Sequence, residues 1–308
     1  MSILAVGSVA LDAVETPAGR VDGVVGGSAV FFSAAASLLT GVRVVGVVGD
    51  DYPLARLRFL RERGVDFTGL DRRTGESFFW EGRYAADFRG RETTETRLGV
   101  FADFDPVVPR EWRDSELVFL GNIDPDLQLG VLDQVVAPRL VAADTMNYWI
   151  ERTPDGLQRV LSRLDVLLVN DEEARQLAGE ADLARAARRI RDRGPGMVVV
   201  KRGEEGADLF ADGWTFSCPA SPPARITDPT GAGDAFAGGF LGYLDRTGPR
   251  DSGAFRRAVK YGAATGSFAV EDFSVDRFRD LSLSELEDRV AGLDAAGVRN
   301  PRLARTPG

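Results

Sequence analysis

Residues 228–236 read DPTGAGDAF, and an apolar run, AGGF, continues over residues 237–240. Gly231 and Gly233 leave their backbone N–H groups open to close approach by a ligand. The helix predicted to follow begins with unpaired N–H donors and a partial positive charge. Together these groups predict a cradle for a phosphate or for a developing oxyanion.

Asp234 lies at the mouth of this predicted cradle. A carboxylate there can accept a proton from a hydroxyl while the N–H groups hold the anion that the hydroxyl attacks. This arrangement is suited to phosphoryl transfer to an alcohol, with Asp234 as the base and Gly231, Ala232 and Gly233 as the anion hole. The alternative is a glycine-rich turn in which Asp234 is only a helix-terminus charge. The length of the full string favours the catalytic interpretation.

Four motifs in this chain resemble signatures of the ribokinase-like (PfkB) carbohydrate kinases. The DPTGAGD string resembles the C-terminal signature of that family, and GGSA at residues 26–29 resembles its Gly-Gly signature. NDEE at residues 170–173 matches its Asn-x-x-Glu motif. VVVKRGEEGA at residues 198–207 resembles its strand and turn at the nucleotide site. The motifs occur in the family's order over most of the chain.

Outside the motifs, short apolar strands alternate with helical patterns. Strands that are apolar throughout and separated by helices predict a parallel sheet covered on both faces. The predicted fold is α/β: a ribokinase-like, doubly wound and mainly parallel sheet flanked by helices, in one domain over residues 1–297 with a tail at 298–308. Strands are expected at residues 3–6, 43–48, 117–120, 140–143, 166–169 and 197–200, and helices at 28–39, 53–63, 127–136, 157–164, 183–193, 232–244, 255–269 and 283–293.

Residues 78–97 interrupt this alternation. An aromatic run at 78–84 and a threonine-rich run at 92–97 flank a turn candidate at 89–91, which predicts a β-hairpin. A lone hairpin is too small to fold by itself. The resemblance implies that these strands, with a segment near residues 20–25, form a small β-sheet lid over the sugar. It also implies a homodimer contact through the lid. A plain surface hairpin is the alternative.

The predicted substrate site begins with Asp12, which follows the first strand. Ligand crevices form at the carboxyl ends of strands in open α/β sheets. The resemblance implies that Asp12 binds two sugar hydroxyls and that Gly26, Gly27 and Ser28 let the substrate approach the backbone. Many family members have an Asn shortly after the two glycines. Here residues 30–32 are Val-Phe-Phe, which predicts a more apolar acceptor pocket.

Two asparagines are further substrate-binding candidates. Asn122 follows the strand expected at 117–120, and Asn147 ends the DTMN segment after the strand at 140–143. DTMN resembles an Asp-Pro-Asn segment of some sugar kinases in the family. Those proteins usually carry an Arg two residues after the Asn, whereas this chain has Trp149.

The nucleotide site is expected near NDEE. Asn170 and Glu173 share one face of the predicted helix start. Because Mg²⁺ keeps several waters, one carboxylate suffices to organise it. The alternative for the pair is a helix cap, and for Lys201 a charge that closes a strand. The resemblance implies that Glu173 organises Mg²⁺ through water and that ATP is bound by Asn170, Lys201, Gly203, Gly206 and Thr230.

Asp228 precedes the base by six residues and matches a position that binds a monovalent cation in cation-activated family members. The resemblance therefore raises K⁺ as a second metal ion. The other ligands in those proteins come from a C-terminal loop that usually contains glycine. Here residues 270–274 read VEDFS, with two added acids. The sequence leaves open whether these acids strengthen a K⁺ site or replace the ion through hydrogen bonds.

Composition excludes several classes of function. The 308 residues include no histidine, so Ser-His-Asp and Cys-His machinery and His-ligated zinc are excluded. A net charge of −9 argues against a nucleic-acid partner. No apolar run of about 18 residues is present, which predicts no membrane span. The single cysteine, Cys218, and the lack of a basic signal region favour the cytoplasm.

These features predict an ATP-dependent kinase that phosphorylates a hydroxyl, most simply a primary alcohol, of a sugar or sugar-like small molecule. A nucleoside kinase of the same family is the alternative, because GGSA at residues 26–29 also resembles adenosine-type members and aromatic lid residues can stack a base. A non-catalytic, ligand-sensing homologue is a third interpretation. The intact Asp234 argues against it.

Overall fold

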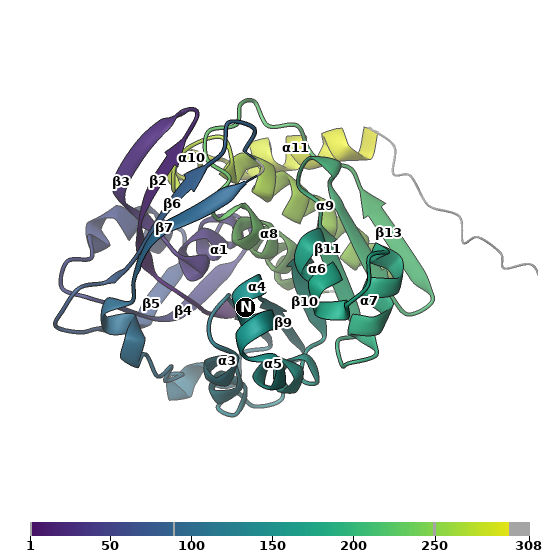
Figure 1. The fold of residues 1–308 in the computed structure, drawn as a ribbon, viewed down its shortest axis with the longest axis horizontal. Helices are drawn as coiled ribbons and strands as arrows, with labels where there is room; N and C mark the ends of the chain where they lie inside the picture. Colours follow the sequence, from purple (N-terminus) through teal and green to yellow (C-terminus); the bar gives the residue numbers. More distant parts are fainter. Residues whose placement is uncertain (1, 89, 249–250, 296–308) are drawn as a thin grey trace, which may run out of the picture.

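The computed structural model describes residues 2–88, 90–248 and 251–295. The tail predicted at 298–308 and the predicted domain end at residue 297 lie outside these residues. Figure 1 shows a broad central sheet with helices on both sides and a second, smaller sheet beside it. This arrangement confirms the predicted fold class. None of the described helices is both long and apolar enough to cross a membrane.

The large sheet is mainly parallel. Within the described residues it has nine strands in the order β13-β12-β11-β10-β9-β8-β1-β4-β5. Only β12 and β13, at one edge, run antiparallel to their neighbours. The strands are β1 (Ser2–Val6), β4 (Gly41–Val48), β5 (Val65–Arg72), β8 (Leu117–Leu120), β9 (Leu140–Asp144), β10 (Val166–Asn170), β11 (Met197–Lys201), β12 (Ala207–Ala211) and β13 (Trp214–Cys218).

Alternate residues of each strand face opposite sides of the sheet, so the sheet divides the core in two. In β1, Ile3 and Ala5 join one apolar cluster, and Leu4 and Val6 join the other. The first cluster is covered by α1 (Ser28–Ala36), α2 (Arg58–Glu62), α8 (Ala232–Thr247), α9 (Ser252–Ala269), α10 (Asp276–Arg279) and α11 (Leu283–Ala295). The second is covered by α3 (Pro125–Leu132), α4 (Asn147–Arg152), α5 (Pro154–Leu161), α6 (Asp171–Ala178) and α7 (Leu183–Arg191).

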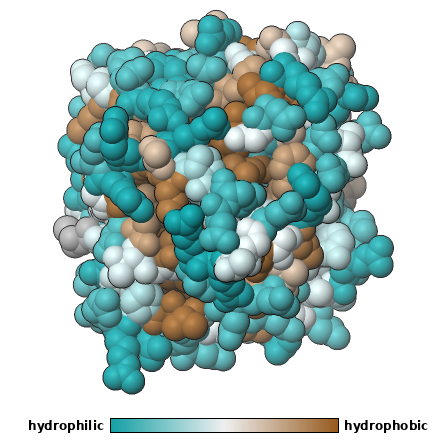
Figure 2. Space-filling model, turned by 90° about the vertical axis from the view of Figure 1, so that its left-hand side faces the viewer, coloured by the Kyte–Doolittle hydropathy of each residue, from teal (hydrophilic) through white to brown (hydrophobic). Residues whose placement is uncertain are grey.

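The small sheet has the order β3-β2-β6-β7 within the described residues. Its hairpin, β6 (Phe78–Tyr84) and β7 (Arg91–Arg97), confirms the strands predicted around residues 78–97. The segment predicted near 20–25 is β3 (Gly19–Gly26). The strand β2 (Ala10–Thr16), which joins β3 to the hairpin, was not predicted. Figure 2 shows this side of the molecule, where hydrophobic surface lies between hydrophilic residues.

Three strands of the large sheet, β5, β12 and β13, were also not predicted from the sequence. The hairpin of β12 and β13 turns at Asp212-Gly213, with Gly213 at a φ of 71°. An Asp-Gly pair between two strands of alternating burial is a strong hairpin signal. These two strands were not predicted because they are not apolar throughout. The helix predicted at 53–63 is shorter, because a 3₁₀ turn, η1 (Leu54–Leu57), precedes α2. The other 3₁₀ turns are η2 (Gly99–Asp103), η3 (Arg110–Trp112) and η4 (Gly203–Glu205).

Candidate active site

The glycine-rich loop leads directly into α8. Gly231 precedes the first helical residue with a φ of 73°, and among the described residues no side chain caps the helix. The Ala232 N–H makes only a long bond, of 3.3 Å, to the Pro229 carbonyl, whereas the Ala235 N–H bonds to the Gly231 carbonyl at 2.8 Å. The helix start therefore presents backbone N–H groups and the positive end of its dipole at residues 231–233.

Gly231 is fixed from behind by an aromatic ring. A Cβ at this position would lie 2.2 Å from Cγ of Phe31. Phe31 and Phe32 are 1% and 0% exposed, and Phe32 stacks on Phe119 with 4.2 Å between ring centroids. Every residue of α1 is buried, so these rings form the core beneath the loop. The prediction that residues 30–32 make the acceptor pocket more apolar is therefore wrong.

A buried ion pair lies against the other glycine of the loop. Lys201 ends β11, and its Nζ is 2.6 Å from Oδ2 of Asp144, which ends β9. A Cβ on Gly233 would lie 2.9 Å from the same Nζ. The ammonium group thus adds a positive charge beside the N–H groups at residues 231–233. Asp144 was not among the predicted site residues, although its segment, DTMN, was singled out.

Asp234 lies in the first turn of α8, close to these charges. Burial and the negative charge of Asp144 raise the pKa of Asp234 to about 7, although the positive charge of Lys201 opposes the shift. A carboxyl group with a pKa near neutrality is well matched to general-base work at neutral pH. The geometry brings the predicted base, the predicted anion hole and a lysine together.

Asn170 and Glu173 form a capping box at the start of α6. The Asn170 side chain accepts a bond from the Glu173 N–H at 2.7 Å, and the Glu173 carboxylate accepts one from the Asn170 N–H at 2.8 Å. Glu173 is buried, and burial together with the charge of Asp144 raises its pKa to about 7. The helix cap is therefore present, and its carboxylate also shares the electrostatic field of Lys201 and Asp234.

Asp12 belongs to the small sheet. It lies within β2, and its carboxylate packs on Gly26, where a Cβ would lie 1.9 Å from Oδ2. Asp12 is 4% exposed. Burial, followed by the charges of Asp228 and Asp234, raises its pKa to about 8. Gly26 thus makes room for the carboxylate itself.

The face of the small sheet that carries Asp12 also carries aromatic side chains. Asp12 is aligned with Trp80 in the parallel pairing of β2 and β6, and aligned residues project from the same face. The Trp80 ring lies over Gly82, and Arg91 lies 5.3 Å from the Trp80 ring centroid. The Arg91 charge lowers the pKa values of Asp12 and Asp234, which places it near both.

The small sheet also contacts the glycine-rich loop directly. The hydroxyl groups of Tyr84, at the end of β6, and Thr230 lie 3.0 Å apart. In Figure 1 the hairpin passes over α1 and approaches the start of α8. Thr230 was predicted to bind ATP, and here its hydroxyl joins the lid to the loop.

Gly27 and Ser28 begin α1. Gly27 has a φ of 94°, and a Cβ there would lie 2.4 Å from the Ser8 carbonyl oxygen. The Ser28 hydroxyl accepts a bond from the Ser8 N–H at 3.1 Å, and the Ser8 hydroxyl accepts one from the Ser28 N–H at 3.0 Å. This reciprocal pair joins the end of β1 to α1. The Ser28 side chain is therefore engaged in holding the two segments together.

The two candidate asparagines bind different side chains. The Asn122 oxygen accepts a bond from Nε1 of Trp149 at 2.9 Å, and its amide nitrogen donates to the Met146 sulfur at 3.0 Å. The Asn147 amide donates to Oε1 of Gln176 in α6 at 2.8 Å. Trp149, which stands where an Arg occurs in some family members, therefore holds Asn122.

Gly203 and Gly206 form the turn between β11 and β12. Their φ values are 52° and 98°, and a Cβ on Gly206 would lie 2.0 Å from the Cys218 carbonyl oxygen. The turn closes with a bond of 2.8 Å from the Arg202 N–H to the Gly206 carbonyl. These glycines are required by the backbone of the turn that follows Lys201.

Asp228 is 1% exposed, and its Oδ1 accepts a bond from the Thr230 N–H at 2.9 Å. Burial raises the pKa of Asp228, and bonds from the Thr230 side chain and the Ser274 backbone oppose this increase. Of the two acids in the adjoining loop, Glu271 pairs with Arg277 and Arg289, and Asp272 pairs with Arg225. Both added acids are thus neutralised by arginines.

Another buried group near Asp12 was not predicted. The Tyr52 hydroxyl is buried without a hydrogen-bond partner in the described residues, and the charge of Asp12 adds to the effect of burial in raising its pKa. Tyr52 follows Gly49-Asp50-Asp51, a polar segment after β4 that carries no motif recognised in the sequence. Only the fold brings this loop to the side of Asp12.

Comparisons with known proteins agree with this geometry. The model of the pfkB family carbohydrate kinases matches residues 134–279. A cytidine kinase from Thermococcus kodakarensis is 31% identical over 81% of this chain and 90% of its own length. The chain belongs to the PfkB family of carbohydrate kinases. It is therefore a phosphotransferase with an alcohol group as acceptor, as the sequence predicted.

Solved structures of this fold resemble the chain along nearly its whole length. A Burkholderia thailandensis nucleoside kinase in complex with inosine superimposes with a TM-score of 0.78 at 22% identity, covering 95% of this chain and 99% of that protein. A putative ribokinase II from E. coli in complex with ATP and Mg²⁺ gives 0.77 at 19% identity, covering 94% and 99%. These similarities confirm the ribokinase-like fold of this PfkB kinase.

Proposed function

We propose that this PfkB kinase transfers the terminal phosphoryl group of ATP to the primary hydroxyl of a ribonucleoside. The choice of a ribonucleoside as the acceptor rests on the pairing of Asp12 with Trp80 on one face of the lid. In its ionised form a carboxylate accepts hydrogen bonds from two vicinal sugar hydroxyls, and such bonds favour loss of the Asp12 proton when the sugar is bound. An indole ring stacks on a base. The cytidine kinase that is similar to most of the chain supports this choice over a free sugar.

In this proposal Asp234 is the base. Its carboxylate takes the proton of the attacking hydroxyl as the new O–P bond forms and the bond to the leaving ADP oxygen breaks. The N–H groups at residues 231–233 and the Lys201 ammonium stabilise the negative charge of the transferred phosphoryl group. The location of Lys201 beside Gly233 and the pKa of about 7 for Asp234 support these roles.

ATP is proposed to lie along the carboxyl ends of β10 and β11. Asn170 ends β10 and Lys201 ends β11, so both face the crevice beyond these strands. Thr230 belongs to the loop before α8, and the turn with Gly203 and Gly206 follows Lys201 directly. This grouping supports one nucleotide site built from the predicted residues.

The surplus of negative charge in this crevice fits a Mg²⁺ ion. The carboxylates of Asp144, Glu173 and Asp234 repel one another, and Lys201 is a positive charge that opposes this repulsion. Oxygen ligands and water are what Mg²⁺ prefers in proteins. Glu173 would hold a water molecule that is bound to the ion. The bound ion would neutralise part of the negative charge of the phosphates.

Replacing Glu173 by Gln is expected to raise the Mg²⁺ concentration at half-maximal rate by about tenfold to a hundredfold, a common cost of losing an outer-shell partner. Gln retains the bond that Glu173 accepts from the Asn170 N–H, so the helix cap survives. Initial rates over a Mg²⁺ titration at saturating acceptor measure the effect. Glu172→Gln, on the exposed side of α6, is the matched control. An unchanged Mg²⁺ dependence would leave Glu173 as a helix cap alone.

Replacing Trp80 by Leu is expected to raise KM for a nucleoside by about tenfold, because base stacking on an aromatic ring contributes on the order of 1–3 kcal/mol. KM for free ribose should not change, since ribose has no base. Phe79→Leu is the control, because Phe79 projects from the opposite face of β6 and stacks with Arg97. Equal effects of Trp80→Leu on nucleoside and ribose would place the base elsewhere.

A homodimer contact through the lid is a further part of the proposal. It is supported by β7, which is exposed along its whole length and forms an edge of the small sheet as described. Edge strands offer unpaired backbone groups to a second chain.

A cytoplasmic location is also part of the proposal. It is supported by Cys218, a free and buried thiol.

A further inference from the structure

The chain that leads into the anion hole is held by the loop after α9. Residues 219–231 belong to no helix or strand. The Thr227 N–H donates to the Val270 carbonyl at 2.7 Å, and the Asp228 N–H donates to the same carbonyl at 3.3 Å. The Thr227 hydroxyl donates to the Glu271 carbonyl at 2.9 Å. The position of this irregular segment therefore depends on residues 270 and 271.

The Glu271 side chain adds a second attachment. Its Oε1 accepts a bond from the Ala224 N–H at 2.8 Å, and the Glu271 carbonyl accepts one from Nε of Arg225 at 2.7 Å. Only 5% of the side chain is exposed. One residue therefore binds the segment before the anion hole at three positions: residues 224, 225 and 227.

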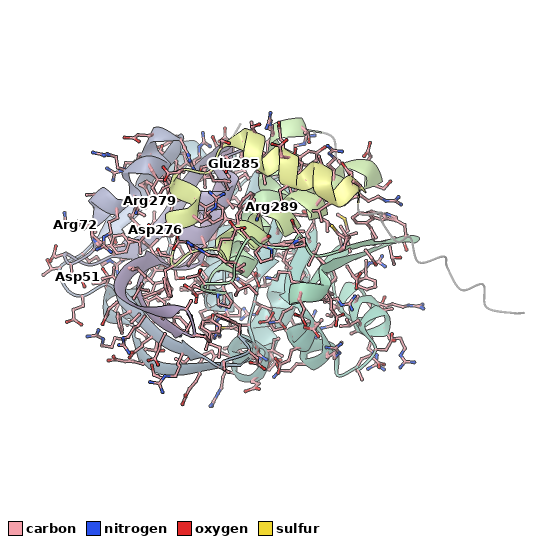
Figure 3. The ribbon with its side chains drawn as sticks, turned by 90° about the horizontal axis from the view of Figure 1, so that it is seen from above. Asp51, Arg72, Asp276, Arg279, Glu285 and Arg289 are labelled. Atoms are coloured by element: carbon pink, nitrogen blue, oxygen red, sulfur yellow. The ribbon has the colours of Figure 1, made fainter. Side chains whose placement is uncertain are left out.

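Two arginines fix the carboxylate of Glu271. Nε of Arg277 lies 3.0 Å from Oε2, and a terminal nitrogen of Arg289 lies 2.8 Å from Oε1. Both guanidinium groups also pack on the ring of Phe268, and Arg289 donates to the Ser267 hydroxyl at 3.0 Å. Figure 3 shows Arg289 on α11, the helix that lies across α9. Although burial opposes them, these contacts and the Ala224 N–H hold the pKa of Glu271 below its usual range, so the ion pairs persist at neutral pH.

The held segment continues without interruption into the catalytic loop. Asp228 binds the Thr230 N–H at 2.9 Å, and Thr230 immediately precedes Gly231. A shift of residues 224–228 would therefore move the N–H groups that are proposed to hold the transferred phosphoryl group. Such groups lose much of their effect when they are misplaced by about 1 Å.

We propose that Glu271, clamped by Arg277 and Arg289, is a positioning residue that sets the anion-hole loop of this kinase in place of a bound monovalent cation. The inference rests on the proposed role of residues 231–233. Asp228, the residue predicted to bind K⁺, already accepts bonds from Thr230 and Ser274. The two acids that follow in the loop are paired with arginines. This arrangement does not fit a K⁺ site.

The test is Glu271→Gln, measured beside the matched control Glu285→Gln. The new amide side chain keeps the shape of the glutamate but loses both ion pairs. Glu285 contacts the same Arg277 from the solvent side, at 3.1 Å, so its replacement removes one charge beside Arg277 while leaving in place both ion pairs that Glu271 makes. Glu271→Gln is expected to lower kcat by roughly tenfold to a hundredfold, with an unchanged acceptor KM. Glu285→Gln is expected to behave as the unmodified protein.

Two further measurements do not depend on the identity of the acceptor. Hydrogen exchange of the amides at residues 224–228 and 230 is expected to speed up in Glu271→Gln and in the milder Arg289→Lys, while exchange in β8 stays constant. The rate of the unmodified kinase is expected to be equal in K⁺, Na⁺ and tetramethylammonium at matched ionic strength. An unchanged kcat in folded Glu271→Gln, unchanged exchange at residues 224–228 and 230, or a clear activation by K⁺ would overturn the inference. Absence of any kinase activity in the unmodified protein would instead count against the proposed function.

Discussion

Asp234→Asn lowers kcat by a factor on the order of 10²–10⁴, the usual cost of removing a general base. Asn has nearly the same shape but cannot take a proton from the acceptor hydroxyl. Because burial raises the pKa of Asp234 from 3.8 to about 7, the ionised side chain costs folding free energy as the pH rises through that range. The Asn variant should therefore be at least as stable as the unmodified protein at pH 8. Initial rates and thermal unfolding, measured on the same samples, check both statements.

The pH dependence of the unmodified kinase follows from the same group. Asp234 can act as a base only when it is deprotonated, so kcat/KM should fall as the pH is lowered through about 7. The residual kcat/KM of Asp234→Asn should not show the decrease near pH 7 that protonation of Asp234 causes. A folded Asp234→Asn protein with undiminished kcat would remove Asp234 from the reaction.

Gly231→Ala is expected to cost about 10²–10³ in kcat, comparable to the loss of one oxyanion-hole donor. The left-handed φ of 73° disfavours any side chain, and the new Cβ would lie 2.2–2.3 Å from three ring atoms of Phe31. The loop must shift to relieve this contact, and its N–H groups then move away from the phosphoryl group. Steady-state kinetics with ATP and the acceptor varied in turn measure the loss.

Gly130→Ala is the matched control for this substitution. Gly130 lies in α3, far along the chain from the loop, and a Cβ there meets no atom of the described residues within 4 Å. The control should retain full activity. If Gly231→Ala is folded and equally active, the backbone at residue 231 does not contribute to catalysis.

The local sequence was enough to predict most strands of the large sheet and the glycine-rich loop before α8. Fully apolar runs such as 117–120 and 166–169 can be buried only in a sheet that is covered on both faces, and they appear as β8 and β10. The anion-binding role proposed for the glycines of DPTGAGD follows from backbone chemistry alone. The helix cap formed by Asn170 and Glu173 could also be predicted from local sequence, because the two residues are only three positions apart.

The rest of the site depends on contacts between distant segments. Asp144 and Lys201 are 57 residues apart and meet only because β9, β10 and β11 lie side by side. Asp12 was expected after a strand of the large sheet, but it lies in β2 because that strand pairs with β6 of the hairpin. Phe31 and Phe32 were assigned to the pocket because their sequence position suggested it. Packing of α8 on α1 buries them instead.

The most direct test of the proposed kinase function is product formation from ATP, Mg²⁺ and a panel of acceptors that includes cytidine, inosine, ribose and a hexose. Chromatography identifies the phosphorylated product, and ³¹P NMR identifies the oxygen that carries the phosphate. We expect rapid transfer to the primary hydroxyl of a nucleoside and much slower transfer to free ribose. Efficient transfer to a free sugar with none to any nucleoside would contradict the proposed acceptor, and no transfer to any alcohol would contradict the catalytic role of Asp234.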